Sequence, residues 1–405
     1  MREGNGEDMT QQPPDGSAPG HARPPAQGQS PGGSPAGWGP PPGAQWPPPY
    51  PPQQPYGQPA YGQQPAYAQQ PYGQPPHARP PLTPARAFPH PEPTPYHQML
   101  RTWDYATWRP VVGVVLLLVA FFVVPTVVFL VVALVASGFA DQDYVSAFMD
   151  FADLTKLTPA KLLGLNLGLA ALVPTTWLLM RALHHLRPRW LSSVVPRLRW
   201  KFFAVCLGLA VVALLAQLAV GAVLPGDGTG TDGGLKDFTT TSAVFAAIIL
   251  LTTPLQAAGE EYVARGYLLQ AFGSLFRNRW VAIVATAVLF ALAHGAQNAP
   301  LFFDRFAFGF IAAWLVTATG GLEAGIALHV LNNFLAFGLA LAYGDLSDAL
   351  NVSEASWWNI ALTVTQSAVY AALVLLVARR MGLQTRSRPP APEPSAAPES
   401  GVATV

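Results

Sequence analysis

Two adjacent glutamates, Glu260 and Glu261, stand in a stretch of the chain that is otherwise apolar, and Arg265 follows them within about one and a half helical turns. Ionisable side chains are costly inside a membrane, so their presence in such a stretch indicates a functional site. Two later apolar segments each carry one histidine, His294 and His329. If the fold gathers these groups, they could take a proton from water and stabilise a developing negative charge.

The spacing of the acidic residues predicts different environments for them. Glu261 and Arg265 are four residues apart, so on a helix they can form an ion pair in the favourable order. Glu260 is turned about 100° from its neighbour and lacks that partner. A carboxylate that is not neutralised in this way is suited to act as a base. The alternative is that both glutamates only anchor helices through buried ion pairs.

The histidines also have partners at helical spacing. Phe290 precedes His294 by four residues and can pack beside its ring, while His329 and Asn333 present an imidazole and a carboxamide on one helix face. The last two side chains could donate hydrogen bonds to one oxygen. A lone histidine is often structural, and a polar pair often joins membrane helices. Three such positions in one chain favour a common site.

Together these groups supply what the hydrolysis of an amide needs. We assign Glu260 as the base, His294 as its water-orienting partner, and His329 with Asn333 as the donors to the oxyanion. Glu261 is then structural support, as are Arg265 and Phe290. No serine or cysteine stands beside a base, which favours direct attack by water over a covalent intermediate.

A zinc site is the competing chemistry. Glu260, His294 and His329 are residue types that serve as catalytic zinc ligands. The H-E-x-x-H pattern is absent, and the two histidines are 35 residues apart in different apolar segments. We therefore expect no cofactor, with zinc as the alternative. The G-x-S-G and G-x-G-D patterns of serine-type and aspartate-type intramembrane proteases are also absent.

The composition predicts an all-α polytopic membrane protein. The chain has 405 residues, of which 51% are hydrophobic and 11% are charged, well below the roughly 25% charge of soluble domains. With a window of about 20 residues, we expect about eight transmembrane helices, at residues 110–137, 160–183, 201–224, 242–274, 280–295, 302–319, 321–343 and 358–379. The fourth segment is too long for one crossing, and we expect it to continue as an amphipathic helix to Phe276.

The charged residues predict how these segments are oriented. Arginines cluster in the connection between the second and third segments, between the fourth and fifth, and after the eighth, whereas the alternate connections carry aspartates. The positive-inside rule places the arginine-rich connections, and hence both termini, in the cytoplasm. The net charge of +1 conceals this asymmetry and indicates no nucleic-acid partner. The single cysteine, Cys206, lies in an apolar segment and is expected to be a small buried side chain.

Three regions follow from composition. Residues 1–98 are rich in Pro, Gly, Gln and Tyr and lack apolar periodicity, which predicts a disordered tail without a signal peptide. Residues 99–385 contain the apolar segments, and residues 386–405 return to Pro, Ala and Ser as a second disordered tail. The tyrosine and proline spacing of the first tail could recruit a partner, whose identity it does not indicate.

Three short motifs resemble those of the CPBP or Abi family of intramembrane glutamic endopeptidases, which are similar to CAAX prenyl proteases. They are E-E-x-x-x-R at Glu260, Glu261 and Arg265, F-x-x-x-H at Phe290 and His294, and H-x-x-x-N at His329 and Asn333. They occur in the family's order over about residues 245–340. The resemblance implies a helical membrane core, a catalytic cavity reached from the cytoplasm or from lipid, and the roles assigned above. Members of this family have often been described as metalloproteases.

The sequence therefore predicts an intramembrane endopeptidase that uses water activated by glutamate and histidine. Its expected partners are the lipid bilayer and a membrane-associated peptide or protein substrate. Only four of its 23 basic residues are lysines, and with the load of Pro, Ala and Gly this indicates a bacterial plasma membrane protein. Two alternatives stay open: a catalytically silent immunity-like or scaffolding protein, and a small-molecule transporter. A transporter built from inverted repeats would carry polar breaks in both halves, but the polar cluster lies almost wholly after residue 255.

Overall fold

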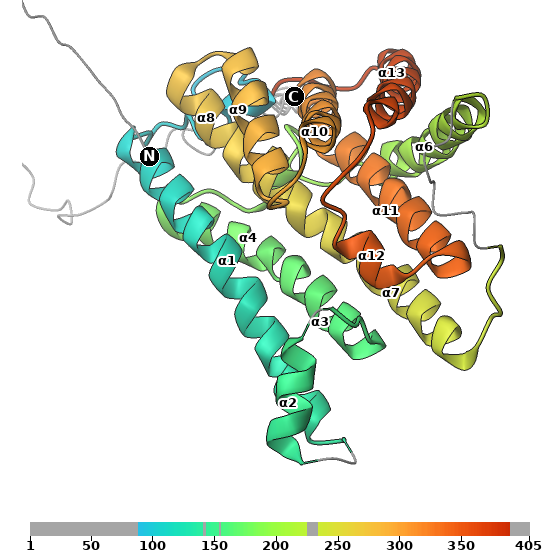
Figure 1. Ribbon diagram of the computed structural model, residues 1–405. Helices are drawn as coiled ribbons and strands as arrows, with labels where there is room; N and C mark the ends of the chain where they lie inside the picture. The colour runs from blue at the N-terminus through green and yellow to red at the C-terminus, as the bar shows by residue number, and fades with distance from the viewer. Residues whose placement is uncertain (1–87, 141–142, 154, 225–233, 389–405) are drawn as a thin grey trace, which may run out of the picture. The chain divides into compact units, whose positions relative to one another are not determined.

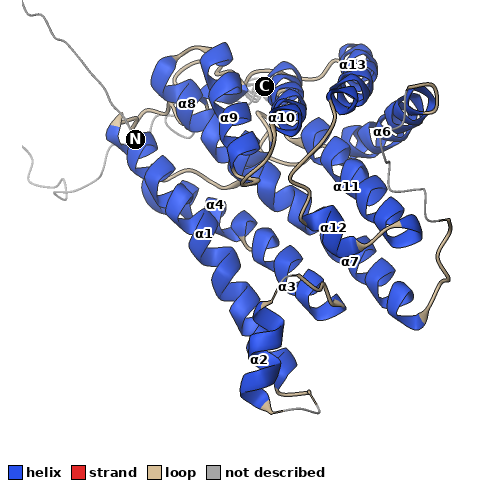
Figure 2. Ribbon diagram, in the orientation of Figure 1, coloured by secondary structure: helices blue, strands red, loops and turns tan. Residues whose placement is uncertain are grey.

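The computed structural model describes residues 88–140, 143–153, 155–224 and 234–388. Within these ranges the chain forms helices joined by loops, with two isolated bridges and no β-strand (Figure 2). The predicted all-helical fold class is confirmed. Most of the predicted N-terminal tail and of the predicted C-terminal tail lies outside the described residues.

The helices run along the chain in the following order (Figure 1): η2 (Tyr96–Gln98), α1 (Trp108–Ser137), α2 (Tyr144–Ala152), α3 (Pro159–Ala170), α4 (Leu172–His184), α5 (Arg189–Ser192), α6 (Trp200–Gly221), α7 (Thr240–Glu261), η3 (Tyr262–Leu268), α8 (Leu269–Phe276), α9 (Arg279–Leu292), α10 (Ala299–Thr319), α11 (Glu323–Tyr343), α12 (Leu346–Leu350) and α13 (Trp357–Arg380). In space, α1 packs on α3, α3 on α7, α7 on α11, α11 on α6, α6 on α13, α13 on α10, and α10 on α9.

Seven of the helical stretches in the described residues are long and apolar enough to cross a membrane, and α9 is a shorter apolar helix of 14 residues. Two of the seven are composite, because α3 and α4 form one stretch and α7, η3 and α8 form another. Every predicted apolar segment is a helix, and its ends fall within three residues of the predicted bounds. The protein is a multi-pass membrane protein.

Hydrogen bonds between the first and last described segments indicate that α9 makes a further crossing. The Thr94 N–H donates to Ser387 Oγ at 3.1 Å, and the Ser387 N–H donates to the Thr94 carbonyl at 2.9 Å. Segments joined in this way lie on one side of the membrane, so the number of crossings between them is even. Seven long helices alone give an odd number. Within the described residues, the shorter apolar helix α9 is the candidate for the eighth crossing.

The connections between the membrane-spanning helices lie alternately on two faces of the protein, as the charge pattern predicted. On the face of the paired ends, Ser193 forms a bridge with Gly321 in the connection from α10 to α11. On the other face, the Leu157 N–H donates to Ser347 Oγ at 3.1 Å, and the Asn298 N–H donates to the Ser353 carbonyl at 2.8 Å. The first face carries the arginine-rich connections. Its assignment to the cytoplasm stays a prediction.

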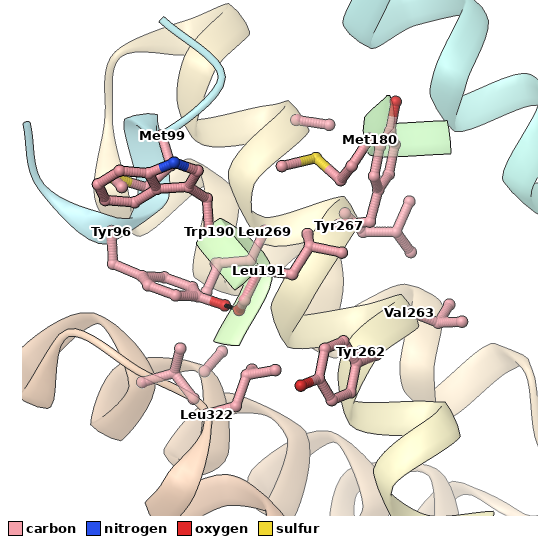
Figure 3. Packing of buried hydrophobic residues seen from close by; sticks show 14 of the residues in the cluster. Tyr96, Met99, Met180, Trp190, Leu191, Tyr262, Val263, Tyr267, Leu269 and Leu322 are labelled. Atoms are coloured by element: carbon pink, nitrogen blue, oxygen red, sulfur yellow. Dashed lines mark hydrogen bonds between the residues drawn. The ribbon is translucent and has the colours of Figure 1, made fainter. Parts of the chain in front are cut away.

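The ordered part begins before the predicted boundary at residue 99. Tyr96 is completely buried, its hydroxyl donates to the Leu191 carbonyl at 2.5 Å (Figure 3), and His90 is also buried. At the other end, Ser387 is buried against Thr94. Residues 88–98 and 386–388 are therefore not parts of disordered tails. Residues 88–98 are Pro-rich and residues 386–388 directly precede a Pro-rich stretch, so composition did not reveal their few anchoring side chains.

Close contact between α3 and α7 fixes the position of the acidic residues. A Cβ atom at Gly259 would overlap the backbone carbonyl of Leu169 on α3, so only glycine permits this approach. Small residues at such crossings are typical of membrane helices. Because Glu260 is the next residue, this contact sets both its depth and the direction of its side chain.

The long fourth span does not continue as a regular α-helix. Its residues Tyr262–Leu268 form the π-helix η3, which runs directly from α7 into α8. Each π-turn contains more residues than an α-turn, so side chains after Glu261 are rotated relative to those before it; π-segments often occur at functional sites. The end of α8 packs on η2, where a Cβ at Gly273 would overlap the His97 carbonyl.

Candidate active site

The predicted ion pair between Glu261 and Arg265 is present. Arg265 Nη1 donates to Glu261 Oε1 at 2.7 Å, and both side chains are completely buried. The guanidinium also lies over the Phe290 ring, 4.1 Å from its centroid. A fully buried arginine needs such compensation, because an unpaired charge is strongly destabilising in this environment. Glu261 and Arg265 thus hold the C-terminal end of α7 against α9.

His329, on α11, lies between the two glutamates. Its Nδ1 is 2.9 Å from Glu261 Oε1, and its Nε2 is 3.7 Å from Glu260 Oε2. The first distance is a hydrogen bond, whereas the second is too long for one. With Nδ1–H donating to Glu261, Nε2 is directed towards Glu260. The imidazole of α11 is therefore oriented by the acid that Arg265 neutralises.

Gln256 is a site residue that sequence reasoning missed. Its Nε2 donates to Glu260 Oε1, and its Oε1 accepts a hydrogen bond of 3.0 Å from Asn333 Nδ2. Gln256 precedes Glu260 by four residues, which places both on one helix face; this spacing was the signal that could have identified it. Asn333 is joined to Gln256 in this structure, so it and His329 do not point at one common oxygen here.

His294 follows the end of α9, and its ring is fixed by Phe290 as predicted. His294 Nδ1 donates to the Phe290 carbonyl at 2.7 Å, and the two rings make an edge contact with centroids 4.8 Å apart. This hydrogen bond leaves Nε2 free to accept a proton or a hydrogen bond. Phe290 also contacts His329 at 5.9 Å between centroids, so one phenylalanine packs against both histidines.

Glu260 and His294 line the same cavity. Its volume is about 370 Å³, and all its other lining residues are apolar. They lie on α1, α3, η3 and α9 and at the residue after α9, and they include Leu117, Phe121 and Leu292. The Glu260 side chain is 14% exposed, whereas that of Glu261 is fully buried. The fold thus separates two identical acids: one is neutralised in the core and the other faces a space that could admit a substrate.

Of the remaining predicted residues, Phe290 also lines this cavity, whereas Glu261, Arg265, His329 and Asn333 do not. His329 lies behind Glu260, and Asn333 lies behind Gln256. In the part of the chain that the structure describes, no three His, Cys, Asp or Glu side chains are grouped so as to hold a metal ion. Glu260, His294 and His329, the residues that would have to hold zinc, therefore do not form such a group in this geometry.

The fold and this cluster define a multi-pass membrane protein with an acid and imidazole site between its helices. Residues 241–335 match the family described as Type II CAAX prenyl endopeptidase Rce1-like. This segment contains all three motifs, and the match confirms the family resemblance that they indicated. The similarity to this family thus covers the part of the chain that carries the site.

A curated relative shares a longer stretch. Over 140 residues, the chain is 29% identical to YyaK of Bacillus subtilis (strain 168), which is itself described as an uncharacterized protein. The match covers 32% of this chain and 47% of YyaK, so the chain spans about half the length of the curated relative it matches. No solved structure matches the chain.

Proposed function

We propose that this protein is an intramembrane endopeptidase that hydrolyses a peptide bond of a membrane-associated protein or peptide by means of activated water. We further propose that it lies in a bacterial plasma membrane with both termini in the cytoplasm. The match to a CAAX-type protease family supports proteolysis in general. The observation that carries the finer proposal is that Glu260 and His294 are the polar groups of one apolar cavity.

Glu260 is the proposed base. It accepts a proton from a water molecule as the water oxygen forms a bond to the carbonyl carbon of the substrate. His294 Nε2 is free to orient this water, because Nδ1 is bound to the Phe290 carbonyl. The tetrahedral intermediate collapses when the bond from carbon to nitrogen breaks and the proton held by Glu260 passes to the leaving amine. The products are an acid and an amine, and the base is regenerated.

His329 and Asn333 are the proposed donors to the oxyanion. His329 is oriented by Glu261 at 2.9 Å. In the doubly protonated form of the ring, Nδ1–H donates to Glu261 and Nε2–H can donate towards the reacting carbonyl beside Glu260. Asn333 must exchange its hydrogen bond with Gln256 for one with the substrate oxygen. Such donors stabilise the charge that develops in the transition state.

The proposal is tested by comparing membrane peptides from strains that express wild type, Glu260→Gln, His294→Ala or His329→Ala. Glu354→Gln serves as the control, since Glu354 is exposed and distant in sequence from the site. We expect specific product peptides in wild type and in the control, and their loss in the three site variants. One product profile shared by all five strains would contradict proteolysis and favour a silent or transport protein.

We propose that the reaction needs no cofactor, with zinc as the alternative. The test uses purified protein and a peptide identified by the comparison of strains. We expect activity to persist after treatment with a chelator. Activity that is lost on chelation and restored by zinc would establish the metal mechanism instead.

A further inference from the structure

A second, polar hollow lies on the face of the paired chain ends. Its volume is about 890 Å³, and it shares no lining residue with the cavity of Glu260. It is bounded by the connection from α4 to α5, by the segment that precedes α1, and by the chain after α13. Three segments that are far apart in the sequence therefore form one concave surface.

The charges that line this hollow are predominantly positive. Arg187, Arg189 and Arg388 all line it and are exposed, whereas Asp104 is its single acidic lining residue. Within the described residues, none of these three guanidinium groups forms an ion pair; the ion pairs there involve other residues. Unpaired arginines in a concave surface concentrate positive potential and attract anions.

The hollow lies at the ends of two membrane-spanning helices. The apolar helix α1 begins at Trp108 and the span of α3 and α4 ends at His184, which itself lines the hollow. Trp103, another lining residue, is 53% exposed. Tryptophan at such positions is typical of the level of lipid headgroups.

We propose that this hollow binds a phosphate group of net negative charge, supplied by the headgroup of an anionic membrane lipid. The planar guanidinium groups of Arg187, Arg189 and Arg388 can each donate two hydrogen bonds to phosphate oxygens. The two unesterified oxygens of a lipid phosphate carry the negative charge, and each can accept hydrogen bonds from more than one arginine. The lipid is favoured as the source because the hollow opens where the apolar spans end.

The arginine-bearing connection is firmly attached to the helix that carries the acid pair. His184 Nε2 and the Tyr267 hydroxyl are hydrogen-bonded at 2.7 Å, and Gln270 Nε2 donates to the Trp190 carbonyl at 2.9 Å. The hydroxyls of Ser192 and Tyr262 are 2.6 Å apart (Figure 3 shows Trp190 and the two tyrosines in this cluster). A ligand in the hollow therefore stabilises the packing around η3, and its binding raises the unfolding temperature.

The test measures the thermal unfolding of the full-length protein in neutral detergent with added phosphatidylglycerol, phosphatidylcholine or inorganic phosphate. The variants are Arg187→Gln/Arg189→Gln and, as a change at the less constrained chain end, Arg388→Gln. The control is Arg379→Gln/Arg380→Gln, which removes two arginines on the same face of the protein, as the first variant does, but outside the hollow.

We expect phosphatidylglycerol to raise the unfolding temperature of wild type and of the control, with phosphatidylcholine much less effective. In the double variant of the hollow, the half-saturating phosphatidylglycerol concentration should rise about tenfold or more. Arg388→Gln should show a smaller rise in the same direction, which keeps the test decisive if the double variant does not fold. Equal responses in wild type, Arg388→Gln and control would overturn the site. A response to inorganic phosphate but not to the lipid would overturn the lipid source.

Discussion

Replacing Gln256 by leucine tests how the proposed base is positioned. In the structure, Gln256 Nε2 donates to Glu260 Oε1 and Gln256 Oε1 accepts from Asn333. A leucine side chain has much of the volume of the glutamine side chain but can form neither hydrogen bond. If Gln256 only fills space, catalysis should change little; if it holds the carboxylate, turnover should fall while substrate binding is largely retained.

The size of the effect follows from the hydrogen bonds that are lost. A hydrogen bond to a charged group contributes about 1.5–3 kcal/mol, so Gln256→Leu should lower kcat about 10- to 150-fold with a small change in KM. Asn333→Leu removes a neutral hydrogen bond of about 0.5–1.5 kcal/mol if it acts only through Gln256. If Asn333 instead donates directly to the oxyanion, the loss should be about 100- to 1000-fold.

The double variant separates these two roles of Asn333. If Asn333 acts through Gln256, the double variant should be no slower than Gln256→Leu, since residues that act through one contact are not additive. If Asn333 is an oxyanion donor, the two losses should multiply. The assay follows cleavage of a synthetic peptide with a fluorophore and a quencher, copied from a product that disappears in the Glu260→Gln strain. Gln217→Leu, on α6, is the control. An unchanged kcat in Gln256→Leu would refute a positioning role for Gln256.

Three further predictions concern stability. Arg265→Met leaves Glu261 without its buried cation, so the free energy of unfolding, measured by denaturant titration, should fall by about 3–5 kcal/mol. The control Arg379→Met changes an exposed arginine and should not affect this free energy. A loss below about 1 kcal/mol in Arg265→Met would contradict the buried pair. Gly259→Ala forces α3 away from α7 and should lower the free energy of unfolding by about 1–3 kcal/mol. Gly208→Ala is the control, because a Cβ atom there meets nothing within 4 Å. Equal unfolding midpoints for the two variants would show that the helices adapt to the added methyl group. Burial and two nearby arginines lower the pKa of His97 to about 4. The pKa of His97 in the unfolded chain is about 6.5, so its contribution to the free energy of unfolding should be constant above that pH. Between pH 6.5 and 4 this contribution should decline by up to about 3 kcal/mol. The variant His97→Gln should lack this part of the decline.

The membrane spans could be predicted from sequence because hydrocarbon imposes one strong requirement on each of them. A helix that satisfies its own backbone hydrogen bonds and is apolar over its length is the simplest solution. The helix α6, for example, spans Trp200–Gly221 where residues 201–224 were expected. The ion pair of Glu261 with Arg265 was predictable for a similar reason, since it depends only on spacing within one helix.

The contacts between helices were less predictable. His329 meets both glutamates, and Asn333 meets Gln256, only because α11 and α7 have particular rotations about their axes. A neutral amide such as Gln256 also gives a weaker signal than a charge in an apolar segment. The π-helix η3 depends on how its residues pack against α4, α5 and α9 rather than on a pattern in its own sequence.

The short length of α9 affects the lipid that surrounds it. Its 14 residues extend about 21 Å at 1.5 Å per residue, against a hydrocarbon thickness of about 30 Å. A bilayer in contact with such a helix adapts by thinning locally. Local thinning brings the boundary between water and lipid closer to the end of α9, where His294 is located. Water then has a short path to the apolar space between the helices.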